Sequence, residues 1–146
     1  MNATPRLVLD TNTVLALWLF DDPTLHRLKL GIERTQLPLY SRDDALEELR
    51  RVLAYPQFGL EADARQALLE AYRRRVVHCP VAAPPSTLPL CRDRDDQKFL
   101  EIADEAGATH LVTRDRLLLK LARHRLVRGR FCILTPERLI EEWPRD

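Results

Sequence analysis

The stretch Arg6-Leu-Val-Leu-Asp10-Thr-Asn12 predicts a short buried strand that ends at a carboxylate. Leucine and valine form a continuous apolar run, which is typical of a strand covered on both faces of a parallel sheet. Asp10 follows directly, where the strand ends and a helix is expected to begin. Because the carboxyl ends of strands in open α/β sheets border the binding crevice, Asp10 is a candidate functional residue.

Strand and helix signals alternate along the rest of the chain. Further apolar segments predict strands at residues 37–40, 76–79, 110–113 and 131–134. Amphipathic segments predict helices at residues 12–20, 23–33, 42–54, 61–75, 95–106, 116–123 and 136–142. Ser41 is the expected N-cap of the third helix, Gly107 is expected to end the fifth, and the Pro-rich segment 80–89 is expected to be a loop. This alternation predicts an α/β fold with a mostly parallel sheet.

Length and composition fit one ordinary globular domain, residues 1–146, because 45% of the residues are hydrophobic and 31% are charged. We expect no membrane partner, since no apolar run could span a bilayer, and the N-terminus lacks a signal pattern, which makes the cytoplasm the expected location. Three widely spaced cysteines without a Cys-x-x-Cys pair argue against a zinc site. With a net charge of +1, the protein has no overall electrostatic field that would attract nucleic acid, so a nucleic-acid partner would have to bind at a local site.

Four acids are expected to meet at one edge of the sheet. Asp10 and Asp115 each follow a predicted strand, and Glu48 and Asp96 each lie on the inward side of a helix just after a loop. Four carboxylates cannot share a small site fully ionised without a cation, and oxygen ligands select Mg²⁺ or Mn²⁺. Such an ion can activate a water molecule and make an acidic pocket receptive to a phosphodiester.

Each acid also has an ordinary structural interpretation. Asp10 and Asp115 could cap the helices that follow them, Asp96 could compensate a helix dipole, and Glu48 could be solvated. A second functional class is a phosphatase or phosphotransfer domain that uses Asp10 as its nucleophile. That chemistry normally needs an opposing lysine, and lysine is scarce here, with Lys120 as the one near a strand-end block.

Several ordered blocks resemble the PIN domain family, the nuclease family that includes the VapC-like ribonuclease toxins of type II toxin–antitoxin systems. The blocks are residues 8–12, 46–53, 92–100, 106–115 and 133–136. The resemblance implies a three-layer α/β/α fold with a parallel sheet of about five strands in the order 3-2-1-4-5. It also implies an endoribonuclease that hydrolyses RNA phosphodiester bonds with water activated by Mg²⁺ or Mn²⁺.

The site residues that the resemblance implies fall on particular positions of this chain. The metal-binding and catalytic acids are Asp10, Glu48, Asp96 and Asp115, supported by Asn12, Thr113 and Asp93. Glu47 directly precedes the second acid, but at about 100° per residue it points away from the apolar side of the helix, so Glu48 is the expected site residue. The implied partners are an RNA substrate, an antitoxin protein and a second copy in a homodimer. A PIN-fold module that binds RNA or protein without catalysis remains the alternative.

Overall fold

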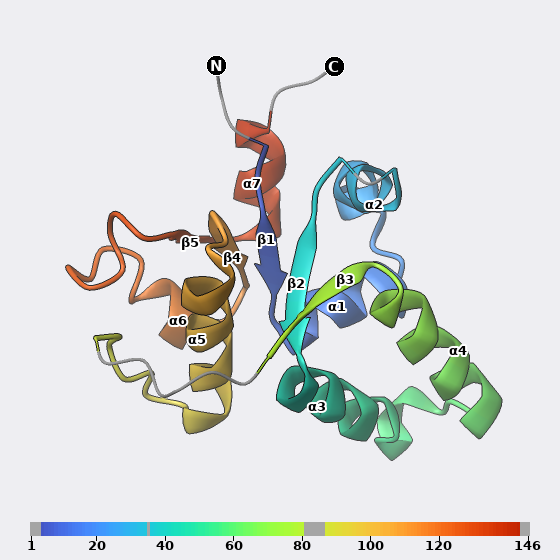
Figure 1. The fold of residues 1–146 in the computed structure, drawn as a ribbon. Coiled ribbons are helices and arrows are strands. Elements are labelled where there is room, and N and C mark those ends of the chain that lie inside the picture. The colour runs from blue at the N-terminus through green and yellow to red at the C-terminus, as the bar shows by residue number, and fades with distance from the viewer. Residues whose placement is uncertain (1–3, 35, 81–86, 144–146) are drawn as a thin grey trace.

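Five parallel strands form one sheet in the computed structural model, which describes residues 4–34, 36–80 and 87–143. The strand order is β3-β2-β1-β4-β5, and every neighbouring pair is parallel, which confirms the predicted 3-2-1-4-5 sheet (Figure 1). The strands are β1 (Leu7–Leu9), β2 (Leu39–Arg42), β3 (Val76–Cys79), β4 (His110–Val112) and β5 (Cys132–Leu134). The strand with Asp10 at its end is therefore central in the sheet.

Helices connect the strands. They are α1 (Thr11–Trp18), α2 (His26–Glu33), α3 (Asp43–Leu53), α4 (Ala62–Arg73), α5 (Gln97–Ala106), α6 (Arg116–Leu119) and α7 (Pro136–Glu142). Short 3₁₀ turns lie at η1 (Pro23–Leu25), η2 (Pro56–Phe58) and η3 (Arg94–Asp96). Gly107 has φ +64° and ends α5 as predicted. Of the predicted loop 80–89, residues 81–86 lie outside the described part of the chain.

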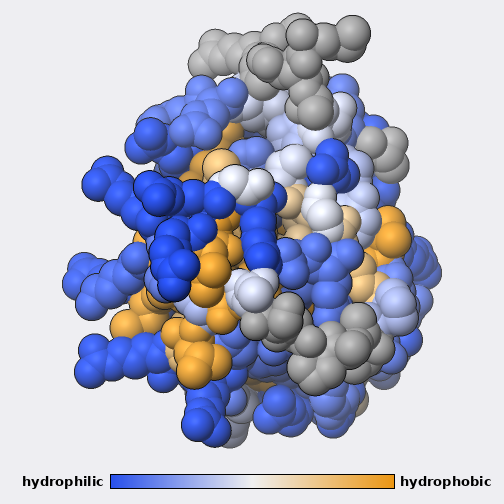
Figure 2. All heavy atoms as spheres, turned by 60° about the vertical axis from the view of Figure 1, so that its left-hand side comes forward, coloured by the Kyte–Doolittle hydropathy of each residue, from blue (hydrophilic) through white to orange (hydrophobic). Residues whose placement is uncertain are grey.

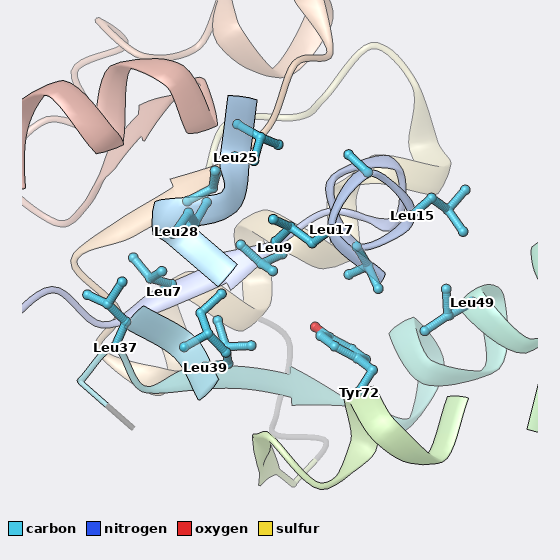
Figure 3. Packing of buried hydrophobic residues seen from close by; sticks show 14 of the residues in the cluster. Leu7, Leu9, Leu15, Leu17, Leu25, Leu28, Leu37, Leu39, Leu49 and Tyr72 are labelled. Atoms are coloured by element: carbon cyan, nitrogen blue, oxygen red, sulfur yellow. The ribbon is translucent and has the colours of Figure 1, made fainter. Parts of the chain in front are cut away.

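Helices cover both faces of the sheet, which gives the expected three layers. Alternate residues of β1 point to opposite faces: Leu7 and Leu9 join one core cluster, whereas Val8 joins the other. The first cluster includes buried leucines of α1, α2 and α3, and Tyr72 of α4 packs beside them (Figure 3). The second cluster is built around α5 and α6, with Phe99 at its centre. Both faces of β1 are therefore covered by apolar residues, as the sequence pattern indicated.

Strand β2 begins and ends two residues later than predicted, so Ser41 is a buried strand residue and not the N-cap of α3. The cause is Arg42, whose side chain is only 5% exposed and contacts three carboxylates. It lies 2.8 Å from Asp44, 2.8 Å from Glu101 and 3.3 Å from Glu105. These contacts hold Arg42 extended beside Cys79 of β3, and α3 begins one residue later.

Helix α6 is shorter than predicted, because it stops at Leu119 and not at residue 123. The chain continues in turns closed by bonds such as Leu121 N–H to the carbonyl of Leu118. Val127 is fully buried in the second core cluster, so the segment must fold inward before β5 begins. The helical pattern of residues 116–123 could not show this tertiary demand. Within the described ranges, no helix is long and apolar enough to cross a membrane.

Candidate active site

Asp10 lies at the carboxyl end of β1, where it caps α1 and is only 3% exposed. Its Oδ1 accepts hydrogen bonds from the backbone N–H of Thr13 at 3.0 Å and from the Thr13 hydroxyl at 2.6 Å. Its Oδ2 accepts from the Thr113 hydroxyl at 2.5 Å. The helix-cap interpretation is therefore correct, but it does not account for the electrostatics of this residue.

Burial raises the pKa of Asp10 above its ordinary value, and the negative charge of Asp115 adds to this effect. The hydrogen bonds from Thr113 and Thr13 lower the pKa but do not cancel the effect of burial. Asp22, which caps η1 at the surface, behaves in the opposite way: the Thr24 side chain and backbone lower its pKa. Asp10 is therefore a buried charge whose hydrogen bonds from Thr13 and Thr113 do not fully offset the cost of its burial.

Thr113 links Asp10 to Asp115. Pairing of Leu9 with Val112 places the ends of β1 and β4 side by side. The Thr113 hydroxyl, fully buried, donates to Asp10 and accepts the backbone N–H of Asp115 at 2.9 Å. Asp115 in turn caps α6 by accepting the Leu117 N–H at 2.7 Å. One threonine thus fixes the relative position of two acids from neighbouring strands.

Asp96 completes a group of three aspartates. It lies at the end of η3, immediately before α5, and the atom Oδ2 is buried without a hydrogen-bond partner. The pKa of Asp96 is raised to about 7, first by desolvation, then by the neighbouring Asp115 carboxyl and by the charges of Asp93 and Asp10. The charges of both other aspartates therefore act on this carboxyl. A buried oxygen without a donor, next to two further carboxylates, favours a cation.

Glu48 reaches the same region from α3, but its carboxylate is already paired. Its Oε2 accepts from the Thr11 hydroxyl, and its Oε1 accepts from the Lys98 ammonium at 2.5 Å. Glu48 and Lys98 are both mostly buried, with side chains 16% and 15% exposed. Glu47 points outward and forms an exposed ion pair with Arg50. The helical phase therefore distinguished the inward glutamate from the outward one.

A family model described as PIN domain matches residues 6–117. The chain belongs to the PIN domain family. PIN domains are generally nucleases, which supports a hydrolase as the broad class of this protein. A similar solved structure is the crystal structure of PAE2754 from Pyrobaculum aerophilum, with a TM-score of 0.59 and 17% identity, covering 94% of this chain and 89% of that one. At this identity the likeness shows the fold alone. Among curated proteins, no significant match was found.

Of the three supporting residues that the resemblance implies, all of which the structure describes, only Thr113 makes hydrogen bonds to the acids. Thr113 contacts Asp10 and Asp115, as described above. Asp93 is exposed and caps η3 by accepting the Asp95 N–H at 2.9 Å, although its charge acts on Asp96. Asn12 is exposed on α1 and makes no side-chain hydrogen bond with the described residues.

Sequence reasoning missed three contacts of the site. Thr13 lies three residues after Asp10, so the spacing of a helix cap could have indicated it. Thr11 and Lys98 carry no such signal, because they meet Glu48 across 37 and 50 positions of sequence. Lys120, which the sequence placed nearest to a strand-end acid, is exposed, and the lysine that reaches the acids is Lys98.

The donor chemistry of the site fits a hard divalent cation. The donors are carboxylate oxygens, Asp96 Oδ2 is buried without a hydrogen-bond partner, and burial raises the pKa values of Asp10 and Asp96, all of which favour a bound cation. Within the described residues, no three histidine, cysteine or acidic side chains form a closed ligand set.

A separate groove of about 760 Å³ runs beside the edge strand β5. Its lining combines apolar residues such as Leu119 with Arg123, Arg128, Arg130 and Arg138, and it includes none of the four acids. Figure 2 brings this end of the sheet forward and shows hydrophobic surface between long hydrophilic side chains. Arg130 and Arg138 are paired with Asp104 and Glu142. The groove is therefore distinct from the acidic site.

The raised pKa of Asp96 predicts how the stability of the metal-free protein changes with pH. Between about pH 4 and about pH 7 the folded state holds a proton on Asp96 that the unfolded state has lost. The free energy of unfolding contributed by Asp96 therefore falls as pH rises through this window, and the Asp96→Asn variant should lack this fall. We would measure the free energy of unfolding of the two proteins in urea and EDTA from pH 4.5 to pH 8. If this free energy changed with pH in the same way in both proteins, the raised pKa would not belong to Asp96.

Proposed function

We propose that this PIN domain is an endoribonuclease that depends on Mg²⁺ or Mn²⁺, with Asp10, Asp96 and Asp115 as the residues that hold the ion. The observation that carries the proposal is the buried Oδ2 of Asp96, which has no hydrogen-bond partner and lies among carboxylates that raise its pKa to about 7. An uncompensated arrangement of this kind costs stability, so it is expected to persist where a cation uses it.

The chain's own residues would orient the ion and the substrate. Thr13 and Thr113 fix both oxygens of Asp10, and Thr113 also fixes the backbone at Asp115, so two of the carboxylates have defined positions. The bound ion would supply Lewis acidity, which activates water and neutralises charge on the phosphodiester. Hydrolysis by water would leave the RNA 2′-hydroxyl out of the reaction.

A phosphotransfer function that uses Asp10 as the nucleophile is less well supported. Both of its oxygens already accept hydrogen bonds, and the side chain is only 3% exposed. The lysine near the acids binds Glu48 and not Asp10. Failure to trap a phospho-aspartate at Asp10 would agree with hydrolysis by water.

We extend the proposal to a toxin role, with a cognate antitoxin and a homodimer, on the resemblance of the sequence blocks to toxin components. Expression of this chain alone should then arrest growth of a bacterial host, and the Asp96→Asn variant should not. Equal growth with wild type and variant would leave the nuclease proposal standing and remove the toxin role.

The test of the nuclease proposal is cleavage of a mixed-sequence RNA in Mn²⁺, in Mg²⁺ and in EDTA. We expect cleavage with either metal, none in EDTA, recovery when metal is added back, and products without 2′,3′-cyclic phosphate ends. Cleavage that persists in EDTA, or that leaves cyclic ends, would indicate a contaminating ribonuclease or a different mechanism.

A matched pair of neighbouring aspartates controls for general effects of charge. Asp96→Asn should reduce cleavage and Mn²⁺ binding measured by calorimetry, whereas Asp95→Asn should preserve both, because the side chain of Asp95 is exposed. Metal binding by a wild type that cleaves no RNA would favour the binding module. Equal behaviour of the two variants would overturn the assignment of Asp96.

A further inference from the structure

Glu48 differs from the three aspartates because it already has a cationic partner. The Lys98 ammonium lies 2.5 Å from Glu48 Oε1, and both side chains are about 85% buried. Thr11 donates to the second oxygen of the same carboxylate. Each oxygen of Glu48 therefore has a donor, whereas Asp96 keeps a buried oxygen without one.

Lys98 also connects the glutamate to the turn that carries Asp96. Its ammonium donates to the backbone carbonyl of Asp95, the residue just before Asp96. Among the described residues, no other lysine or arginine forms an ion pair with Glu48, Asp10, Asp96 or Asp115. The site thus divides into a neutral Glu48–Lys98 pair and an uncompensated group of three aspartates.

This division bears on the number of ions that the site can hold. A second divalent ion beside the first would normally take Glu48 as a ligand, and it would have to displace both Lys98 and Thr11. Displacement would leave a mostly buried ammonium next to added positive charge, which is unfavourable in a partly desolvated site. The pair therefore opposes a second ion and leaves the aspartates to bind the first.

We propose that the site takes one divalent ion, because the Lys98 ammonium neutralises Glu48 and keeps this carboxylate from binding a second ion. This inference rests on the proposed nuclease function and deepens it. Lys98 is a positioning residue: it holds the Glu48 carboxylate and ties it to the backbone carbonyl of Asp95, the residue before Asp96.

The test is a Mn²⁺ titration, in which free ion is followed by electron paramagnetic resonance. Wild type should bind one ion per chain. Lys98→Met keeps most of the aliphatic stem but frees Glu48, so a second, weaker ion should bind at high Mn²⁺. Cleavage by this variant should fall on the order of 10²-fold at low Mn²⁺ and recover partly as the second ion binds. Lys98→Arg should keep one ion.

Two further variants make the outcome decisive. Lys120→Met removes an exposed lysine and should match wild type in stoichiometry and cleavage. Lys98→Met combined with Glu48→Gln removes the freed carboxylate and should bind one ion again. Two ions in wild type, or a Lys98→Met variant that binds one ion and cleaves normally, would overturn this inference alone. A wild type that binds no ion would overturn the proposed function as well.

Discussion

The Asp10→Asn variant is expected to fold normally but to cleave RNA on the order of 10³-fold more slowly than wild type. Asparagine has the same shape as aspartate, so its carbonyl can still accept from Thr13 and cap α1. The Thr113 hydroxyl oxygen has two lone pairs, so it can accept a hydrogen bond from the new amide as well as from the Asp115 N–H. The backbone around the site therefore has no reason to change.

The stability of this variant separates loss of function from loss of fold. Burial raises the pKa of Asp10, so replacing it removes an unfavourable buried charge. In EDTA at neutral pH, the melting temperature of Asp10→Asn should equal or exceed that of wild type. Asp22→Asn changes a surface cap in the same way and should leave cleavage unchanged. Full cleavage by a clean preparation of Asp10→Asn would contradict the proposed role of this residue.

The Arg42→Ala variant is expected to lose about 3 kcal/mol of unfolding free energy, because truncation leaves buried charges without their partner. The Arg42 side chain is 5% exposed, and the carboxylates of Glu101 and Glu105 that it contacts are 27% and 13% exposed. The two glutamates lie one turn apart on α5, so they would repel each other once the arginine is removed. The melting temperature should fall by roughly 10 °C.

A surface ion pair provides the control for this prediction. Arg50 contacts Glu47, but the two side chains are 59% and 51% exposed. Arg50→Ala should therefore change the unfolding free energy by less than about 1 kcal/mol. Thermal unfolding at low and high salt would compare the two variants. Similar small losses in both would show that the Arg42 cluster is not an organising contact between β2 and α5.

The sequence was most informative where a local pattern decided the structure. The apolar run before Asp10 gave the central strand, because a strand covered on both faces must be apolar throughout. Gly107 ended α5 because its φ of +64° suits glycine. Helical phase separated Glu48, which faces the site, from Glu47, which faces solvent. Each of these features depends on residues that are close together in the chain.

Contacts between distant segments could not be predicted in this way. Glu101 and Glu105 lie 59 and 63 positions away from Arg42, so no local pattern links them, but tertiary packing brings both to this last residue of β2. Lys98 binds Glu48 only because α3 and the start of α5 meet at the carboxyl edge of the sheet.

By itself, the sequence determined the order of strands and helices and the acids at the edge of the sheet. Only the tertiary structure decided how those acids differ: Asp96 has a buried oxygen without a partner, whereas Glu48 is neutralised by Lys98. The physical reason is that periodicity and capping act within a few residues, whereas desolvation and ion pairing depend on which distant side chains share the same buried space.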